Sequence, residues 1–91
     1  MTTAFALLQP LKTNLGIVAD VYDEQLLLLL RNAQDAITRE GVTLTGSAED
    51  DTLTIQYAAW TWRERDTGGA MPRMLRFALN NRILSAKARG T

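Results

Sequence analysis

The sequence contains no cysteine and no histidine. The first absence excludes disulfides and thiolate chemistry. The second removes the commonest general base and the commonest metal ligand, and it leaves every serine and threonine without a histidine that would activate it. We therefore expect that the protein is not an enzyme and that it has no catalytic residues, no cofactor and no metal.

Long apolar runs and glycine-rich phosphate loops are also missing. No stretch approaches the ~20 apolar residues that span a bilayer, and the opening MTTAFALLQP has no base of the kind that begins a secretory signal. Gly68-Gly69 follows no strand pattern, so we interpret it as part of a loop. Glu49, Asp50 and Asp51 suit the start of a helix better than a cation site. We expect no membrane partner.

The formal net charge is zero, but the charges are divided along the chain. Residues 1–70 carry ten acids and five bases, whereas residues 71–91 have no acid and five bases: Arg73, Arg76, Arg82, Lys87 and Arg89. The dipole of a terminal helix accounts for Lys87 and Arg89 but not for Arg73 and Arg76 in its first turns. This asymmetry indicates a partner for the basic end, either nucleic acid or an acidic surface of another subunit.

The most regular segment is DEQLLLLLRNAQDAITREG, which predicts a helix over residues 23–40 that Gly41 closes. Asp20 or Asp23 is expected to cap its start. One apolar stripe runs along it at helical spacing: Leu26, Leu29, Leu30, Ala33 and Ile37. Leu27 and Leu28 lie off this stripe. They indicate apolar neighbours on a second side, from the same chain or from another copy.

Pro10 leaves two starts open for the first helix, because proline is tolerated at the first position of a helix but not in its interior. We expect a helix over residues 10–15, preceded by a mobile arm over residues 1–8; a kinked helix over residues 3–15 is the alternative. Gly16 is expected to end it in the left-handed conformation, with Ile17 as its hydrophobic partner.

The third helix is predicted over residues 48–65, after an extended linker (42–46) from which Leu44 reaches the core. Ser47 is its expected N-cap, and Asp50 would complete a variant of the capping box. Residues 52–57 alternate like a strand, but no second strand is available. We place Trp60 in the core and Trp62 at the surface or in an interface, since exposed tryptophan is favoured at protein contacts.

The last helix is predicted over residues 72–88, beginning at Pro72 after a loop. Its expected buried stripe is Leu75, Ala78, Leu79 and Ile83, with Phe77 and Leu84 beside it. Asn80 and Asn81 are poor helix formers, so we expect partners for their amides. Gly90 would end the helix, leaving a tail over residues 88–91. The fold class is therefore all-α: one domain, 1–91, a small bundle of about four helices.

Several segments together resemble the head–tail connector (adaptor) proteins of tailed phages. The segments are LKTNLGI (11–17), YDEQL (22–26), LLRNAQDAI (29–37), YAAW (57–60) and the terminal MPRMLRFALNNRILSAKARG. The likeness covers about residues 8–90 and consists of apolar and glycine patterns, without catalytic residues. It implies a helical subunit of a homo-oligomeric ring that lies between the portal protein and a stopper or tail-completion protein and encloses the DNA channel.

Two functional hypotheses follow. In the first, the protein is a virion structural protein of the head–tail junction, present in the host cytoplasm during assembly and in transient contact with packaged DNA. Its five terminal bases would line the channel or contact a neighbour, and Leu27, Leu28 and Trp62 would contribute apolar interface. In the second, the protein is a small nucleic-acid-binding module whose Arg73, Arg76 and Arg82 contact phosphates.

Overall fold

The computed structural model describes residues 1–89 and contains four helices: α1 (Ala4–Leu15), α2 (Asp23–Arg39), α3 (Ala48–Arg63) and α4 (Arg73–Ala88). No strand forms within that range. The predicted all-α class is confirmed, including a helix where residues 52–57 alternate like a strand. The expected helix end at Gly90 lies outside the described residues.

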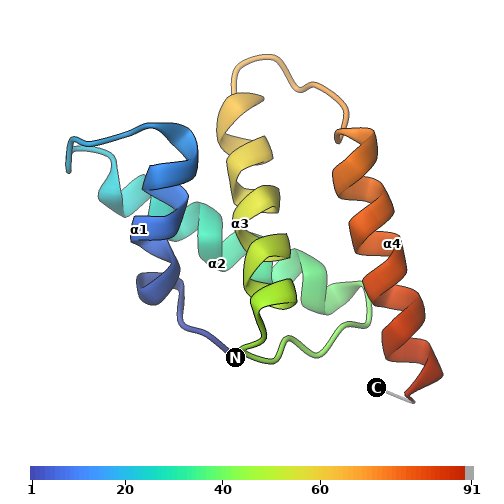
Figure 1. The fold of residues 1–91 in the computed structure, drawn as a ribbon. Coiled ribbons are helices and arrows are strands. Elements are labelled where there is room, and N and C mark those ends of the chain that lie inside the picture. The colour runs from blue at the N-terminus through green and yellow to red at the C-terminus, as the bar shows by residue number, and fades with distance from the viewer. Residues whose placement is uncertain (90–91) are drawn as a thin grey trace.

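The helices form two layers (Figure 1). Helices α1, α3 and α4 lie side by side, and α2 crosses behind α1 and α3. The subunit is elongated and thin, with extents of 41 × 27 × 18 Å. Helix α4 packs mainly on α3, whereas α1, α2 and α3 all contact one another. The α1–α2 loop and α4 therefore lie at opposite edges of the molecule (Figure 1).

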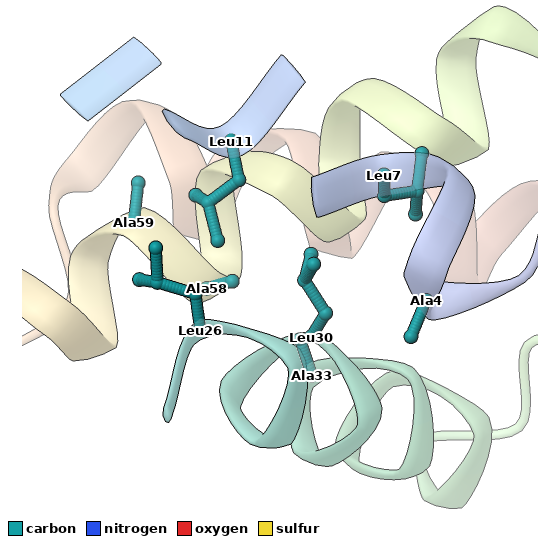
Figure 2. Close-up of a cluster of buried hydrophobic side chains, with 8 residues drawn as sticks. All are labelled: Ala4, Leu7, Leu11, Leu26, Leu30, Ala33, Ala58 and Ala59. Atoms are coloured by element: carbon teal, nitrogen blue, oxygen red, sulfur yellow. The ribbon is translucent and has the colours of Figure 1, made fainter. Parts of the chain in front are cut away.

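The first core cluster joins α1, α2 and α3 (Figure 2). Leu11, Leu26 and Leu30 have no exposed surface, and each such leucine stabilises the fold by about 1.5–3 kcal/mol. The small side chains of Ala58 and Ala59 allow α3 to approach the other two helices closely. A second cluster lies under α4 and consists of Ile37, Val42, Leu44, Leu53, Leu75 and Leu79. Its inclusion of Leu44 confirms that the linker reaches the core.

Helix α1 corrects the expected start at Pro10 and the expected N-terminal arm. It begins at Ala4, where the Thr3 hydroxyl accepts a hydrogen bond from Ala6 N at 3.2 Å, and Pro10 lies in its interior. Ala4 and Leu7 are buried against α2 and α3. Packing of this apolar face offsets the hydrogen bond that proline removes. The alternative, a helix over residues 3–15, is the better description.

The turn after α1 follows the sequence prediction. Gly16 has a φ of 71°, and Ile17 N donates to Lys12 O at 2.9 Å. Ile17 packs against the first cluster. This is the left-handed stop with its hydrophobic contact.

The predicted N-cap of α2 is wrong, although the helix boundaries hold and Gly41 closes it as predicted, with a φ of 98° and its N–H donating to Thr38 O at 3.0 Å. Tyr22 is the N-cap residue and makes no side-chain capping bond. The carboxylates of Asp20 and Asp23 instead bind Lys12 Nζ, at 2.8 and 2.9 Å. An ion pair with a lysine buried beneath them competes successfully with the exposed N–H groups of the helix.

Helix α3 begins as predicted but without a capping box. The Ser47 hydroxyl accepts from Asp50 N at 3.2 Å. The Asp50 carboxylate does not return to Ser47; it accepts hydrogen bonds from the backbone N–H and the hydroxyl of Thr45. Ser47 N donates to the Thr45 hydroxyl. Asp50 thereby fastens the linker to the first turn of α3.

Candidate functional site

The charged residues of α4 divide into exposed and buried ones. Arg73, Arg76, Lys87 and Arg89 are exposed. Arg82 is not: only 5% of its surface is accessible. The prediction that Arg82 faces a channel, a neighbour or a nucleic acid is therefore wrong.

Arg82 is buried because it pairs with Asp50. Its Nε lies 2.7 Å from Asp50 Oδ1, and its Nη2 donates to Asp50 Oδ2 and to the carbonyl of Thr43, the latter at 2.9 Å. Burial alone would raise the pKa of Asp50, but the hydrogen bonds from Arg82 and Thr45 outweigh it and lower that pKa. The hydrogen bond with Asp50 raises the pKa of Arg82. Both groups stay charged, and their role is to join α4, α3 and the linker.

Helix α4 presents two different exposed stripes in addition to its buried face. The buried face consists of Leu75, Leu79, Arg82 and Ala86. The basic stripe comprises Arg73, Arg76, Asn80 and Lys87, and the apolar stripe comprises Met74, Phe77, Asn81 and Leu84. Three members of the basic stripe precede a member of the apolar stripe by one position. The two stripes therefore lie side by side, about 100° apart around the helix.

The apolar stripe is more exposed than the sequence prediction allowed. Met74 is 77% exposed, Phe77 56% and Leu84 63%. Ala78, predicted to be buried, is exposed, and so are Asn80 and Asn81. Large apolar side chains gathered on one exposed face are typical of a contact site.

A groove between α3 and α4 adjoins this stripe. It has a volume of about 490 Å³ and is lined by Ala48, Glu49, Thr52, Leu53, Gln56, Ala78, Asn81 and Arg82. A smaller recess of about 230 Å³ continues past Gln56 to Trp60 and Met74. The outer side of α4 and this groove form one surface with an apolar floor at Leu53 and Leu75.

The three predicted apolar interface residues differ in their exposure. Leu28 is more than half exposed. Leu27 and Trp62 are partly buried and pack against the first cluster. The Trp62 ring also packs edge-on against Tyr22, with the ring centroids 5.3 Å apart. The Arg65 guanidinium lies over the Trp62 ring, 3.9 Å from its centroid. Only Leu28 therefore presents most of its side chain to solvent.

The α1–α2 loop and the first turn of α2 form a second exposed patch, which we call the tip: Val18, Asp20, Val21 and Glu24. Val18 is 92% exposed and Val21 78%. The Asp20 and Glu24 carboxylates are exposed beside them. The tip thus combines apolar and acidic groups, whereas α4 combines apolar and basic ones.

Lys12 holds the tip in place. The hydrogen bond with Asp20, followed in size by the one with Asp23, raises the pKa of Lys12. The hydrogen bond from Lys12 in turn lowers the pKa of Asp20. Lys12 itself is only 4% exposed. Its charge therefore lies beneath the tip, and the outermost charges there are carboxylates.

Sequence reasoning missed Met74, Val18 and Val21 and did not assign a role to Phe77 and Leu84. One signal was available. Met74, Phe77 and Leu84 are spaced by three and seven residues, which is the spacing of a second apolar stripe. Val18 and Val21 lie in a short connector without periodicity, so only their exposure identifies them.

No family model, no curated protein and no solved structure matches the chain. Within residues 1–89, no group of three acidic side chains gathers in a way that would hold a metal ion. None of the four helices is both long and apolar enough to cross a membrane.

Proposed function

We propose that the protein is a structural head–tail connector of a tailed phage or prophage. Copies of the chain would form a ring between the portal protein and the stopper or tail-completion protein, with the DNA passing through the central channel. The protein would assemble in the host cytoplasm and remain at the head–tail junction of the virion.

The observation that carries this proposal is the division of charge between α4 and the rest of an elongated subunit. Asp50 and Arg82 neutralise each other inside the fold. Nine acids and five bases then remain in residues 1–70, against four bases and no acid in residues 71–89. Such a subunit attracts the basic end of one copy to the acidic body of the next.

A head-to-side contact of this kind is heterologous, and it closes into a ring when the rotation between neighbours divides the circle. The apolar groups at both edges, on α4 and at the tip, supply surface that a single copy leaves in water. The likeness of segments 11–17, 22–26, 29–37, 57–60 and 71–90 to the connector proteins also supports the proposal.

The proposal is tested by sedimentation velocity over a concentration series, combined with negative-stain electron microscopy. The purified chain is examined alone and with a tailed-phage portal protein from the same genome. We expect ring-shaped particles, at least in the presence of the portal. A chain that stays monomeric at its highest concentration and neither binds the portal nor forms rings with it would refute this function.

A nucleic-acid-binding module is the second candidate, because three bases of α4 lie on one exposed stripe: Arg73, Arg76 and Lys87. If phosphate contacts dominate, affinity for duplex DNA falls steeply with salt, by a slope of roughly one per neutralised phosphate on logarithmic axes. Fluorescence anisotropy with labelled duplex between low and moderate salt measures this slope. An absence of binding at low salt rejects the module. Weak binding without a steep slope agrees with a channel that DNA passes but does not occupy.

A further inference from the structure

We propose that the outer side of α4, formed by its apolar stripe and the α3–α4 groove, binds the tip of a second copy of this chain. This inference rests on the proposed self-assembly and assigns the two surfaces that meet. Phe77 and Leu84 of one copy contact Val18 and Val21 of the next, and the basic residues beside the stripe lie near the tip carboxylates.

The shapes of the two surfaces are compatible. The tip is a protruding loop whose two valines are almost fully exposed. The opposite edge offers a groove of about 490 Å³ beside the exposed face of α4. A projecting apolar loop thus has a recess with an apolar floor that it can enter. The two surfaces lie at opposite edges of the subunit (Figure 1), so each copy can use both at once.

The charges select this pairing over contact between two α4 helices. In an antiparallel α4–α4 pair, equivalent flanks of the two helices face each other, so Arg73 and Arg76 of one copy would lie beside basic residues of the other. Like charges placed opposite each other across an interface are unfavourable. At the tip the exposed charges are Asp20 and Glu24. Contact between α4 and the tip therefore joins opposite charges as well as apolar groups.

A polar residue within the apolar stripe argues for a protein partner over a lipid surface. An amphipathic helix that lies on a membrane buries an uninterrupted apolar face. The polar Asn81 interrupts the apolar stripe between Phe77 and Leu84. Within a protein interface an amide at that position can be hydrogen-bonded, for example to the backbone of an incoming loop.

Disulfide trapping tests the contact directly, because the native chain has no cysteine and so gives no background. One preparation carries Phe77→Cys and the other carries Val21→Cys, with different affinity tags. The two are mixed under mild oxidation, and the cross-linked heterodimer is measured over time. We expect it to form about tenfold faster than with the control pair, because a bound neighbour holds the thiols at millimolar effective concentration.

The control pair is Phe5→Cys with Val21→Cys. Phe5 is also an exposed phenylalanine on a helix, 73% exposed, but it lies on α1, away from α4. Equal rates for the two pairs overturn the proposal. So does a Phe77→Cys homodimer that forms faster than the mixed pair, since that result means that α4 binds α4.

The result separates this inference from the proposed function. If the cross-linked heterodimer forms faster than the control but the chain forms no ring, alone or with portal, the contact is correct and the connector role is wrong. If the wild-type chain forms rings but trapping equals the control, the connector role is correct and the proposed contact is wrong. Binding to vesicles of phosphatidylcholine and phosphatidylserine that Phe77→Asp abolishes, together with control-level trapping, would assign the surface to lipid and overturn the proposal.

A mixing experiment tests the two-sided geometry. Phe77→Asp disables the α4 side, and Val21→Asp disables the tip. Each variant alone is expected to be monomeric, while an equal mixture forms dimers and nothing larger, since one intact pair of surfaces remains. Unchanged circular dichroism and Tm verify folding. If the folded single variants assemble like the wild type, the proposed surfaces are not the ones used.

Discussion

Arg82 and Asp50 form an ion pair inside the subunit, with Nε and Oδ1 2.7 Å apart and both side chains almost entirely buried. The pair joins α4 to the first turn of α3, and the contact of Arg82 with Thr43 O adds the linker. Because α4 packs mainly on α3, this polar contact positions the helix that carries both the basic and the apolar stripe.

Replacing either partner is expected to destabilise the fold strongly. Asp50→Ala leaves a buried guanidinium without its counter-ion, which costs about 3–5 kcal/mol. Arg82→Ala leaves the carboxylate with only Thr45 as a partner and has an effect of similar size. Urea denaturation gives the free energy of unfolding. The control is Arg73→Ala on the same helix, where an exposed base changes stability by less than about 0.5 kcal/mol. Equal stability of the Arg73 and Arg82 variants would contradict the structural role.

The same pair makes stability depend on acid pH. The pKa of Asp50 is lower in the folded protein than its ordinary value of 3.8. A carboxyl with a depressed folded pKa contributes stability above the unfolded pKa, and that contribution is lost as the pH falls through the folded value. The wild type should therefore lose more free energy of unfolding than Asp50→Asn when the pH falls from about 5 to about 2. Urea titrations at several pH values measure this, and parallel curves for the two proteins would show that Asp50 does not contribute.

Replacing Pro10 by alanine is expected to stabilise the fold. It lies in the interior of α1 and its side chain is exposed, so Pro10→Ala restores a backbone hydrogen bond without changing the core. Proline in a helix interior costs about 3 kcal/mol, and roughly 1 kcal/mol is recovered because proline restricts the unfolded chain. The net gain expected is about 1–2 kcal/mol, visible as a higher Tm. A loss of stability would indicate that α1 begins at Pro10.

Charge reversal on α4 is expected to weaken assembly. Arg73→Glu together with Arg76→Glu places acids opposite the tip carboxylates of the neighbouring copy, so the oligomer should dissociate at concentrations where the wild type is assembled. Sedimentation velocity gives the distribution of species. Arg31→Glu with Arg39→Glu is the matched control, since it reverses two exposed bases of α2 and the same number of charges. Equal loss of assembly in both double variants would show that net charge, and not the basic stripe, is responsible.

The dependence of assembly on salt concentration also tests the contribution of the exposed charges. Exposed charges are screened over about 10 Å at 0.1 M salt and about 3 Å at 1 M. Wild-type assembly should weaken as salt rises, while the apolar part of the contact persists. Assembly that strengthens steadily with salt would mean that apolar burial alone drives the contact.

The four helices and most of their ends follow from local patterns in the sequence. Ser47 and Gly16 act on the backbone within a few residues of themselves, so their effects can be read from the local sequence. Pro72 also marks the start of α4, although it is the N-cap residue and not, as predicted, the first helical residue. The leucine stripe of α2 likewise follows from spacing alone, and Leu26 and Leu30 are buried as the pattern indicates.

Where two interactions compete for the same residue, contacts between segments distant in sequence determine which one forms. Pro10 lies inside α1 because packing of Ala4 and Leu7 outweighs a local preference. Asp20 turns to Lys12, and Arg82 turns inward to Asp50, because oppositely charged groups distant in sequence meet in the fold. In α4 the predicted stripe is buried at Leu75 and Leu79. The surface against which the helix packs decided how far that burial extends, and it leaves Ala78, Phe77 and Leu84 exposed.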